Sequence, residues 1–150
     1  MREAINAALK ESMKARDADR TGTLRMVSAA FKDRDIEARG AGKGAASDDD
    51  LKQLLAKMIK QRQESAGIYE QNARPELAAK ERAEIAVIQE FLPQQMSEAE
   101  VASAIEAAIA ETGAASIKDM GRVMAALKAK FTGMMDFGAA NGVVKAKLAG

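Results

Sequence analysis

The chain has 150 residues, and its 23 basic and 22 acidic side chains give a formal net charge of +1. Hydrophobic residues make up 47% and charged residues 30% of the sequence, as in a globular protein. The absence of cysteine excludes disulfides and thiol chemistry, and the absence of histidine excludes Ser-His-Asp and Cys-His catalysis. No apolar run approaches the ~18 residues of a membrane span. We expect a cytoplasmic protein that needs no metal and no cofactor.

Two helices are predicted before the first glycine-rich segment. Ile5, Leu9 and Met13 recur at four-residue spacing, which predicts a helix over residues 2–16 with these side chains on one face. The segment 21–23 can cap a second helix. The apolar stripe of this second helix is predicted to comprise Leu24, Val27, Phe31 and Ile36.

Residues 40–46 contain three glycines and are predicted to form a flexible loop. Ser47 follows as the predicted cap of a third helix, and the aspartates 48–50 occupy its first turn, where the helix dipole favours carboxylates. Consecutive side chains of a helix point in different directions, so we interpret these aspartates as part of the cap and not as a metal site. The third helix should end near residue 72, and Pro75 should open a fourth.

A domain boundary is predicted at Pro93, which stops the fourth helix and precedes two polar glutamines. We expect an all-α fold, with a bundle of about four helices over residues 1–92 and a small three-helix tail domain over residues 93–150. Serine or aspartate caps and closing glycines mark the three tail helices, at Ser97, Gly113, Ser116, Asp119, Gly133 and Asp136. Val143, Val144 and Leu148 are expected to be buried.

The sequence offers few combinations of residues that are typical of a catalytic site. Glu81, Glu84 and Glu90 have no histidine or cysteine partner, so we interpret them as a solvent-exposed face. The glycines of the 40–46 loop do not meet the Walker phosphate-loop pattern, and no strand is predicted before them. No catalytic residue is predicted.

The charge is unevenly distributed, because residues 112–150 carry six basic and only two acidic side chains. Lys118 and Arg122 are four residues apart and are expected to share a helix face. Such a basic face could dock on a phosphate backbone, or it could simply be a solvated helix exterior.

Two segments resemble signatures of the YqeY-like family. Residues 118–124, KDMGRVM, resemble its K-D-M-G-K-V-M motif, and residues 81–93 match its E-x-x-E-I-x-V-L-x-x-Y-L-P block. The resemblance covers essentially the whole chain. The family is related to the tail domain of the B subunit of aspartyl/glutamyl-tRNA amidotransferase (GatB), which engages tRNA. The residues that resemble this tail domain are Gly121, Val123, Met124, Gly133, Asn141, Val144 and Leu148.

The resemblance implies a helical, tRNA-associated protein without catalytic machinery of its own. Contacts with tRNA phosphates are expected from Lys118, Arg122, Lys128, Lys130 and Lys145. Gly121 is expected to permit the close approach of a helix or backbone, and Asn141 is expected to supply a hydrogen bond near a helix end. The alternatives are a protein-interaction module, or an accessory component of a glutamine-dependent tRNA amidotransferase.

One turn departs from the family pattern. Relatives usually carry a basic residue after the glycine that matches Gly133, where this chain has Met134 and Met135. We expect both methionines to be exposed, which would weaken a phosphate contact at this turn and favour an apolar contact with a protein.

Overall fold

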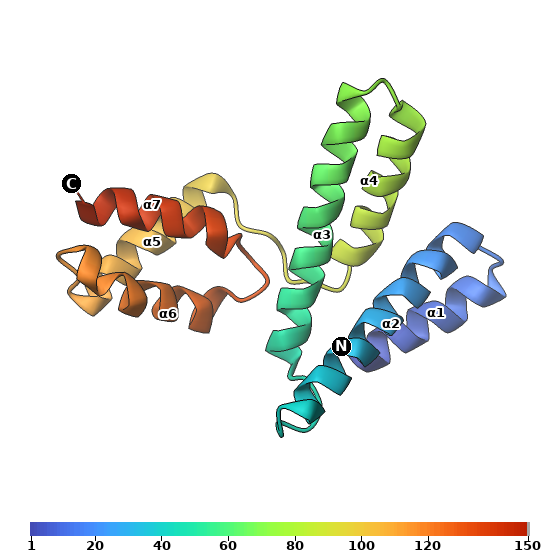
Figure 1. The fold of residues 1–150 in the computed structure, drawn as a ribbon, viewed down its shortest axis with the longest axis horizontal. Helices are drawn as coiled ribbons and strands as arrows, with labels where there is room; N and C mark the ends of the chain where they lie inside the picture. The colour runs from blue at the N-terminus through green and yellow to red at the C-terminus, as the bar shows by residue number, and fades with distance from the viewer. Residues whose placement is uncertain (150) are drawn as a thin grey trace. The chain divides into compact units, whose positions relative to one another are not determined.

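A computed structural model describes residues 1–149, which form seven α-helices and one short 3₁₀-helix and contain no strand (Figure 1). The predicted all-α fold class is therefore confirmed. The chain divides into two compact units, residues 1–93 and the residues from Gln94 onward, and each unit is described by itself. No helix in the described part of the chain is long and apolar enough to cross a membrane.

The N-terminal unit consists of two helical hairpins (Figure 1). Helices α1 (Arg2–Lys14) and α2 (Ala18–Gly40) form the first hairpin, and α3 (Asp48–Gln71) and α4 (Pro75–Gln89) form the second. One apolar core joins the four helices, because α2 packs against both α3 and α4. Its fully buried large side chains are Ile5, Leu24, Val27, Leu51, Leu55 and Ile88.

The predicted start of the third helix is confirmed. The Ser47 hydroxyl accepts a hydrogen bond from the Asp50 N–H at 3.1 Å, and the Asp50 carboxylate accepts one from the Ser47 N–H at 3.1 Å. This reciprocal pair is a capping box, and it lowers the pKa of Asp50, chiefly through the backbone hydrogen bond from Ser47. Pro75 occupies the first turn of α4, as predicted.

The predicted cap of the second helix is wrong. The helix begins one turn earlier, where the Asp17 carboxylate accepts a hydrogen bond from the Arg20 N–H at 3.1 Å. Thr21 and Thr23 are instead buried within α2, and the Thr21 hydroxyl donates a 2.8 Å hydrogen bond to the Ser12 hydroxyl. The Ser12 hydroxyl donates in turn to the Leu9 carbonyl at 2.8 Å, and the Thr23 hydroxyl donates to the Asp19 carbonyl at 3.2 Å. Each buried hydroxyl therefore has an acceptor, which explains why polar side chains are tolerated there.

Two side chains that were assigned to apolar faces are exposed. Met13 is 51% exposed, because a strict four-residue repeat drifts about 40° per step around a helix, and α1 buries Ser12 instead. Ile36 is 64% exposed, whereas Ala38 is buried and continues the inner face of α2.

The C-terminal unit contains α5 (Glu98–Thr112), the 3₁₀-helix η1 (Ile117–Asp119), α6 (Met120–Phe131) and α7 (Phe137–Ala149). The predicted caps are confirmed at Ser97, which accepts from the Glu100 N–H at 3.2 Å, and at Asp136, which accepts from the Gly138 N–H at 2.9 Å. Gly113 ends α5 in the left-handed conformation with φ of +64°. The core of this unit comprises Ile105, Ala108, Val123, Leu127, Met135, Ala140 and Val144.

The expected exposure of both turn methionines is wrong. Met135 is only 6% exposed and belongs to the core, and Met134 is half-buried. Gly133, with φ of +81°, reverses the chain after α6, and the Met134 N–H then bonds the Phe131 carbonyl at 2.9 Å. Val143 was expected to be buried but is 41% exposed, because Ala140 and Val144, four residues apart, form the inner line of α7.

Candidate nucleic-acid interface

Lys118 and Arg122 lie on either side of the start of α6. Lys118 is exposed and belongs to η1, and Arg122 lies in the first turn of α6. The two side chains are therefore not carried by one continuous α-helix. Instead, Arg122 folds back: it forms a salt bridge with Asp119, and its Nη1 donates to the Thr112 carbonyl at 3.1 Å.

Asp119 holds the turn that precedes α6. Its carboxylate accepts hydrogen bonds from the N–H groups of Ala115 at 2.9 Å and Ser116 at 3.2 Å. The Ala115 N–H, the Arg122 guanidinium and the Ser116 N–H, in that order, lower the pKa of Asp119 to about 2. Arg122 therefore neutralises a carboxylate of its own unit, which reduces the charge that it offers to a phosphate.

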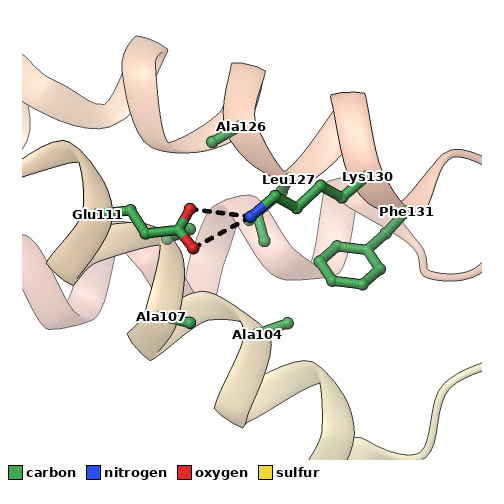
Figure 2. A pocket seen from close by; sticks show the side chains of 8 residues that line it. Ala104, Ala107, Glu111, Ala126, Leu127, Lys130 and Phe131 are labelled. Atoms are coloured by element: carbon green, nitrogen blue, oxygen red, sulfur yellow. Dashed lines mark hydrogen bonds and ion pairs between the residues drawn. The ribbon is translucent and has the colours of Figure 1, made fainter.

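Lys130 is also paired. Its ammonium lies 2.9 Å and 3.1 Å from the two carboxylate oxygens of Glu111, so that the ion pair connects α6 to α5 (Figure 2). The pair borders a small, shallow hollow between these helices. Apolar side chains form most of its lining, with Ala104, Ala107, Ala108, Ala126, Leu127 and Phe131 beside the pair. A similar link joins Lys147 to Glu106 of α5 at 3.3 Å.

Lys128, Lys145 and Lys118 form no salt bridge with any described residue. Lys128 precedes Lys130 by two residues, which places it about 200° around α6 from the flank that faces α5. Lys145 precedes Lys147 by two residues and is likewise turned away from the α5 side of α7. Helices α6 and α7 pack against each other, and η1 contacts both of them. Because Lys128 and Lys145 are turned away from α5, we place them, together with Lys118 of η1, on the α6–α7 side of the unit.

Gly121 and Asn141 belong to the same side. Gly121 lies seven residues before Lys128, and Asn141 lies four residues before Lys145, so each shares a helix face with a free lysine. Both residues are exposed. A Cβ atom added at Gly121 would meet no atom within 4 Å, so the chain itself makes no close approach there. We call Lys118, Gly121, Lys128, Asn141 and Lys145 the α6–α7 lysine face.

The structure thus divides the seven predicted contact residues. Five form the α6–α7 lysine face, while Arg122 and Lys130 pair with Asp119 and Glu111. The acidic partners were missed in the sequence. The three-residue spacing of Asp119 and Arg122 is a local signal for a helix-surface pair. The spacing of Glu111 and Lys130 carries no such signal, because only the packing of α5 on α6 brings them together.

The described residues therefore form an all-helical protein whose C-terminal unit has acidic side chains on α5 and free lysines on α6–α7. The chain belongs to the YqeY-like protein family, whose model matches residues 2–148. This match confirms the resemblance seen in the two sequence motifs.

The chain is also similar to fungal proteins. "Altered inheritance of mitochondria protein 41, mitochondrial" of Saccharomyces cerevisiae (strain YJM789) is 29% identical over 90 residues, which cover 60% of this chain and 47% of the yeast protein. The chain therefore spans about half the length of that relative. "Uncharacterized protein C22F3.15" of Schizosaccharomyces pombe is 31% identical over 98 residues, which cover 65% of this chain and 76% of that protein.

Proposed function

We propose that this protein binds tRNA through the α6–α7 lysine face and recognises the phosphate backbone without catalysing a reaction. The observation that carries the proposal is the contrast among the basic residues of α6 and α7. Lys130 and Lys147 are paired with glutamates of α5, whereas Lys128 and Lys145, each two residues away, form no salt bridge with any of residues 1–149. When exposed lysines contact phosphates, they displace cations that are condensed on the RNA, and the release of these cations favours binding.

Recognition through this face would depend on the shape of the RNA. Three lysines and one asparagine supply ammonium and amide donors for phosphate and 2′-hydroxyl oxygens, but few groups that can read a base edge. The proposal includes a cytoplasmic site of action. Its link to tRNA rests on the resemblance of residues 121–148 to the tail domain of the amidotransferase B subunit.

A second candidate is an accessory role in a glutamine-dependent tRNA amidotransferase, which the same resemblance favours. In that case the lysine face would still hold tRNA, and a partner subunit would perform the chemistry. The protein-interaction alternative based on exposed methionines has lost its support, since Met135 is buried and Met134 is half-buried.

The experiment compares two lysines of one helix. Lys128→Glu should weaken tRNA binding by about tenfold, whereas Lys130→Glu should have a smaller effect, because Lys130 is already paired with Glu111. The measurement is fluorescence anisotropy of labelled total tRNA at several salt concentrations. With three phosphate contacts, the log-log salt slope of the unmodified protein should be about −2 to −3.

The triple variant Lys118→Glu, Lys128→Glu, Lys145→Glu should abolish most of the salt-dependent binding. Its matched control reverses three exposed lysines of the N-terminal unit: Lys10, Lys14 and Lys80. Circular dichroism checks that each variant is folded. If the triple variant keeps the original affinity and salt slope, the lysine face is a solvated exterior and the proposal is wrong.

A further inference from the structure

Helix α2 has an outer face that the fold does not use. Its inner face is buried through Leu24, Val27 and Phe31, whereas Ala29 and Ile36 on the opposite side are exposed. Gly22, Ala29 and Ile36 follow one another at seven-residue intervals and therefore form one line along the helix. A Cβ atom added at Gly22 would meet nothing within 4 Å, so no packing within the chain requires glycine at this position.

Three cations run parallel to this apolar line. Arg25, Lys32 and Arg39 are also seven residues apart, which separates them by about 10 Å along the axis, and all three are exposed. None forms a salt bridge within the described residues. By contrast, the other two arginines of α2 are paired: Arg20 with Glu90 at 2.5 Å and Arg34 with Glu37 at 3.5 Å.

The other flank of the line differs in charge. Asp33 is exposed, whereas the sulfur of Met26, seven residues earlier, lies 3.0 Å from the Arg62 Nη2 of α3. This flank therefore presents a carboxylate, and its methionine already contacts the fold. The face thus has a small or apolar crest, cations at seven-residue intervals along one edge and an anion on the other. We call this surface the α2 outer face, formed by Gly22, Arg25, Ala29, Lys32, Asp33, Ile36 and Arg39.

We propose that the α2 outer face binds an amphipathic helix of a partner protein that carries carboxylates along one edge of its apolar seam. A seven-residue repeat is the spacing at which two helices stay in contact along their length. The seam would cover Ile36 beside Ala29, while the carboxylates would pair with Arg25, Lys32 and Arg39. Gly22 and Ala29 leave the crest low, which allows the backbone of the second helix to come close.

Charge complementarity favours a helix over the other anionic surfaces. A nucleic-acid backbone would pair with the three cations, but it would gain nothing from Ile36 and would be repelled by Asp33. A membrane-bound helix needs a broad apolar face that enters the lipid, and here the large apolar side chain that the face exposes is Ile36. This surface lies in the N-terminal unit, so the inference is independent of the proposed binding of tRNA.

The test uses the full chain and a synthetic three-heptad helical peptide with a leucine seam, glutamates on one edge and lysines on the other. Fluorescence anisotropy of the labelled peptide should show saturable binding. Arg25→Glu with Lys32→Glu and Arg39→Glu should weaken it by about tenfold or more. A second peptide, with lysines in place of the glutamates and glutamates in place of the lysines, should bind this triple variant better than it binds the unmodified chain.

The matched control is the variant Lys118→Glu, Lys128→Glu, Lys145→Glu, which has the same change in charge and should leave peptide binding unaltered. Ile36→Ser tests the apolar crest without touching charge. Its side chain is 64% exposed, so folding should be unaffected while peptide binding weakens several-fold.

Several results would overturn the inference. These are the absence of saturable peptide binding, an equal loss in the lysine-face control, and full retention of binding by Ile36→Ser. Loss of tRNA binding, or of binding to vesicles containing phosphatidylglycerol, in the α2 triple variant with peptide binding retained would assign the face to that other ligand. Failure of tRNA binding in all proteins, with peptide binding intact, would refute only the proposed function.

Discussion

Arg62 connects three helices of the N-terminal unit through one side chain. Its Nε donates to Glu84 of α4 at 3.0 Å, its Nη1 donates to the Met58 carbonyl at 3.1 Å, and its Nη2 lies 3.0 Å from the Met26 sulfur of α2. The side chains of Arg62 and Glu84 are only 13% and 18% exposed. A charge with so little access to water depends on its protein partners, so this pair differs from a surface salt bridge.

We predict that Glu84→Gln destabilises the N-terminal unit by about 2 kcal/mol, because it leaves the Arg62 guanidinium largely buried without its counter-charge. Urea unfolding followed by circular dichroism measures the change. The matched control is Glu70→Gln, which removes the partner of Arg82 in a pair whose side chains are 52% and 51% exposed, and which should cost below ~0.5 kcal/mol. Equal losses in the two variants would contradict this interpretation of Arg62.

Sequence periodicity located most of the core but not its edges. Leu24, Val27 and Phe31 are buried as predicted, since their spacing follows the helical repeat closely. Met135 was missed because it follows a turn, where helical periodicity gives no direction for a side chain. Glu84 was interpreted as solvent-exposed from its residue type alone. Its burial arises from Arg62, which lies 22 residues earlier on a facing helix.

At the scale of the helices, the starts of α3, α5 and α7 were predictable because one polar side chain determines each of them. The start of α2 was not, since Asp17 and Thr21 are both good caps and the segment between them is compatible with a helix. The division of the basic residues into paired and free ones required the packing of α5 against α6 and α7. The sequence identified the candidate residues of the lysine face but not which of them are free.

The turn before α6 provides a prediction about pH. Asp119 has a pKa of about 2 in the folded chain, below the usual value of about 3.9. A lowered folded-state pKa means that the ionised carboxylate adds stability above about pH 4, and that this contribution is lost as the pH falls toward 2. Asp119→Asn should therefore lower the melting temperature at neutral pH. The difference from the unmodified protein should shrink as the pH falls from about 4 toward 2.

Thermal unfolding across this pH range, followed by circular dichroism, measures the difference. Asp33→Asn is the control, because Asp33 is an exposed carboxylate of α2 that caps no helix. A constant gap between Asp119→Asn and the unmodified protein at all pH values would show that the hydrogen bonds survive protonation, contrary to the prediction.

At the scale of the whole chain, the structure has two separate apolar cores. Thirteen buried residues form the core of the N-terminal unit and seven form that of the C-terminal unit, among the residues described. The segment between them makes hydrogen bonds with the C-terminal unit. The Gln95 side chain donates to the Gly133 carbonyl at 2.6 Å, and the Met96 N–H donates to the Met134 carbonyl at 2.9 Å, so the chain joins the C-terminal unit from Gln95 onward.

We predict that limited proteolysis cuts first around residues 92–94, before the glycine-rich loop at 40–46. The loop carries its own restraints: the Asp35 carboxylate accepts from the Ala46 N–H at 2.9 Å, and Arg2 donates to the Ala46 carbonyl at 2.7 Å. Both contacts oppose the local unfolding that a protease requires. Mass spectrometry of the first fragments identifies the site, and an initial cut within residues 40–46 would contradict the prediction.

The two units should also unfold separately, and the C-terminal unit should melt first. It buries fewer apolar side chains, and a domain of about 60 residues is only marginally stable by burial alone. Fragments ending at Pro93 and beginning at Gln94 should each be helical, and the sum of their melting curves should reproduce that of the full chain.

Met135→Ala should lower only the transition of the C-terminal fragment, by the equivalent of about 2 kcal/mol or more, because it opens a cavity in that core. A single transition in the full chain that both Met135→Ala and Glu84→Gln shift would instead show that the two cores unfold as one cooperative unit.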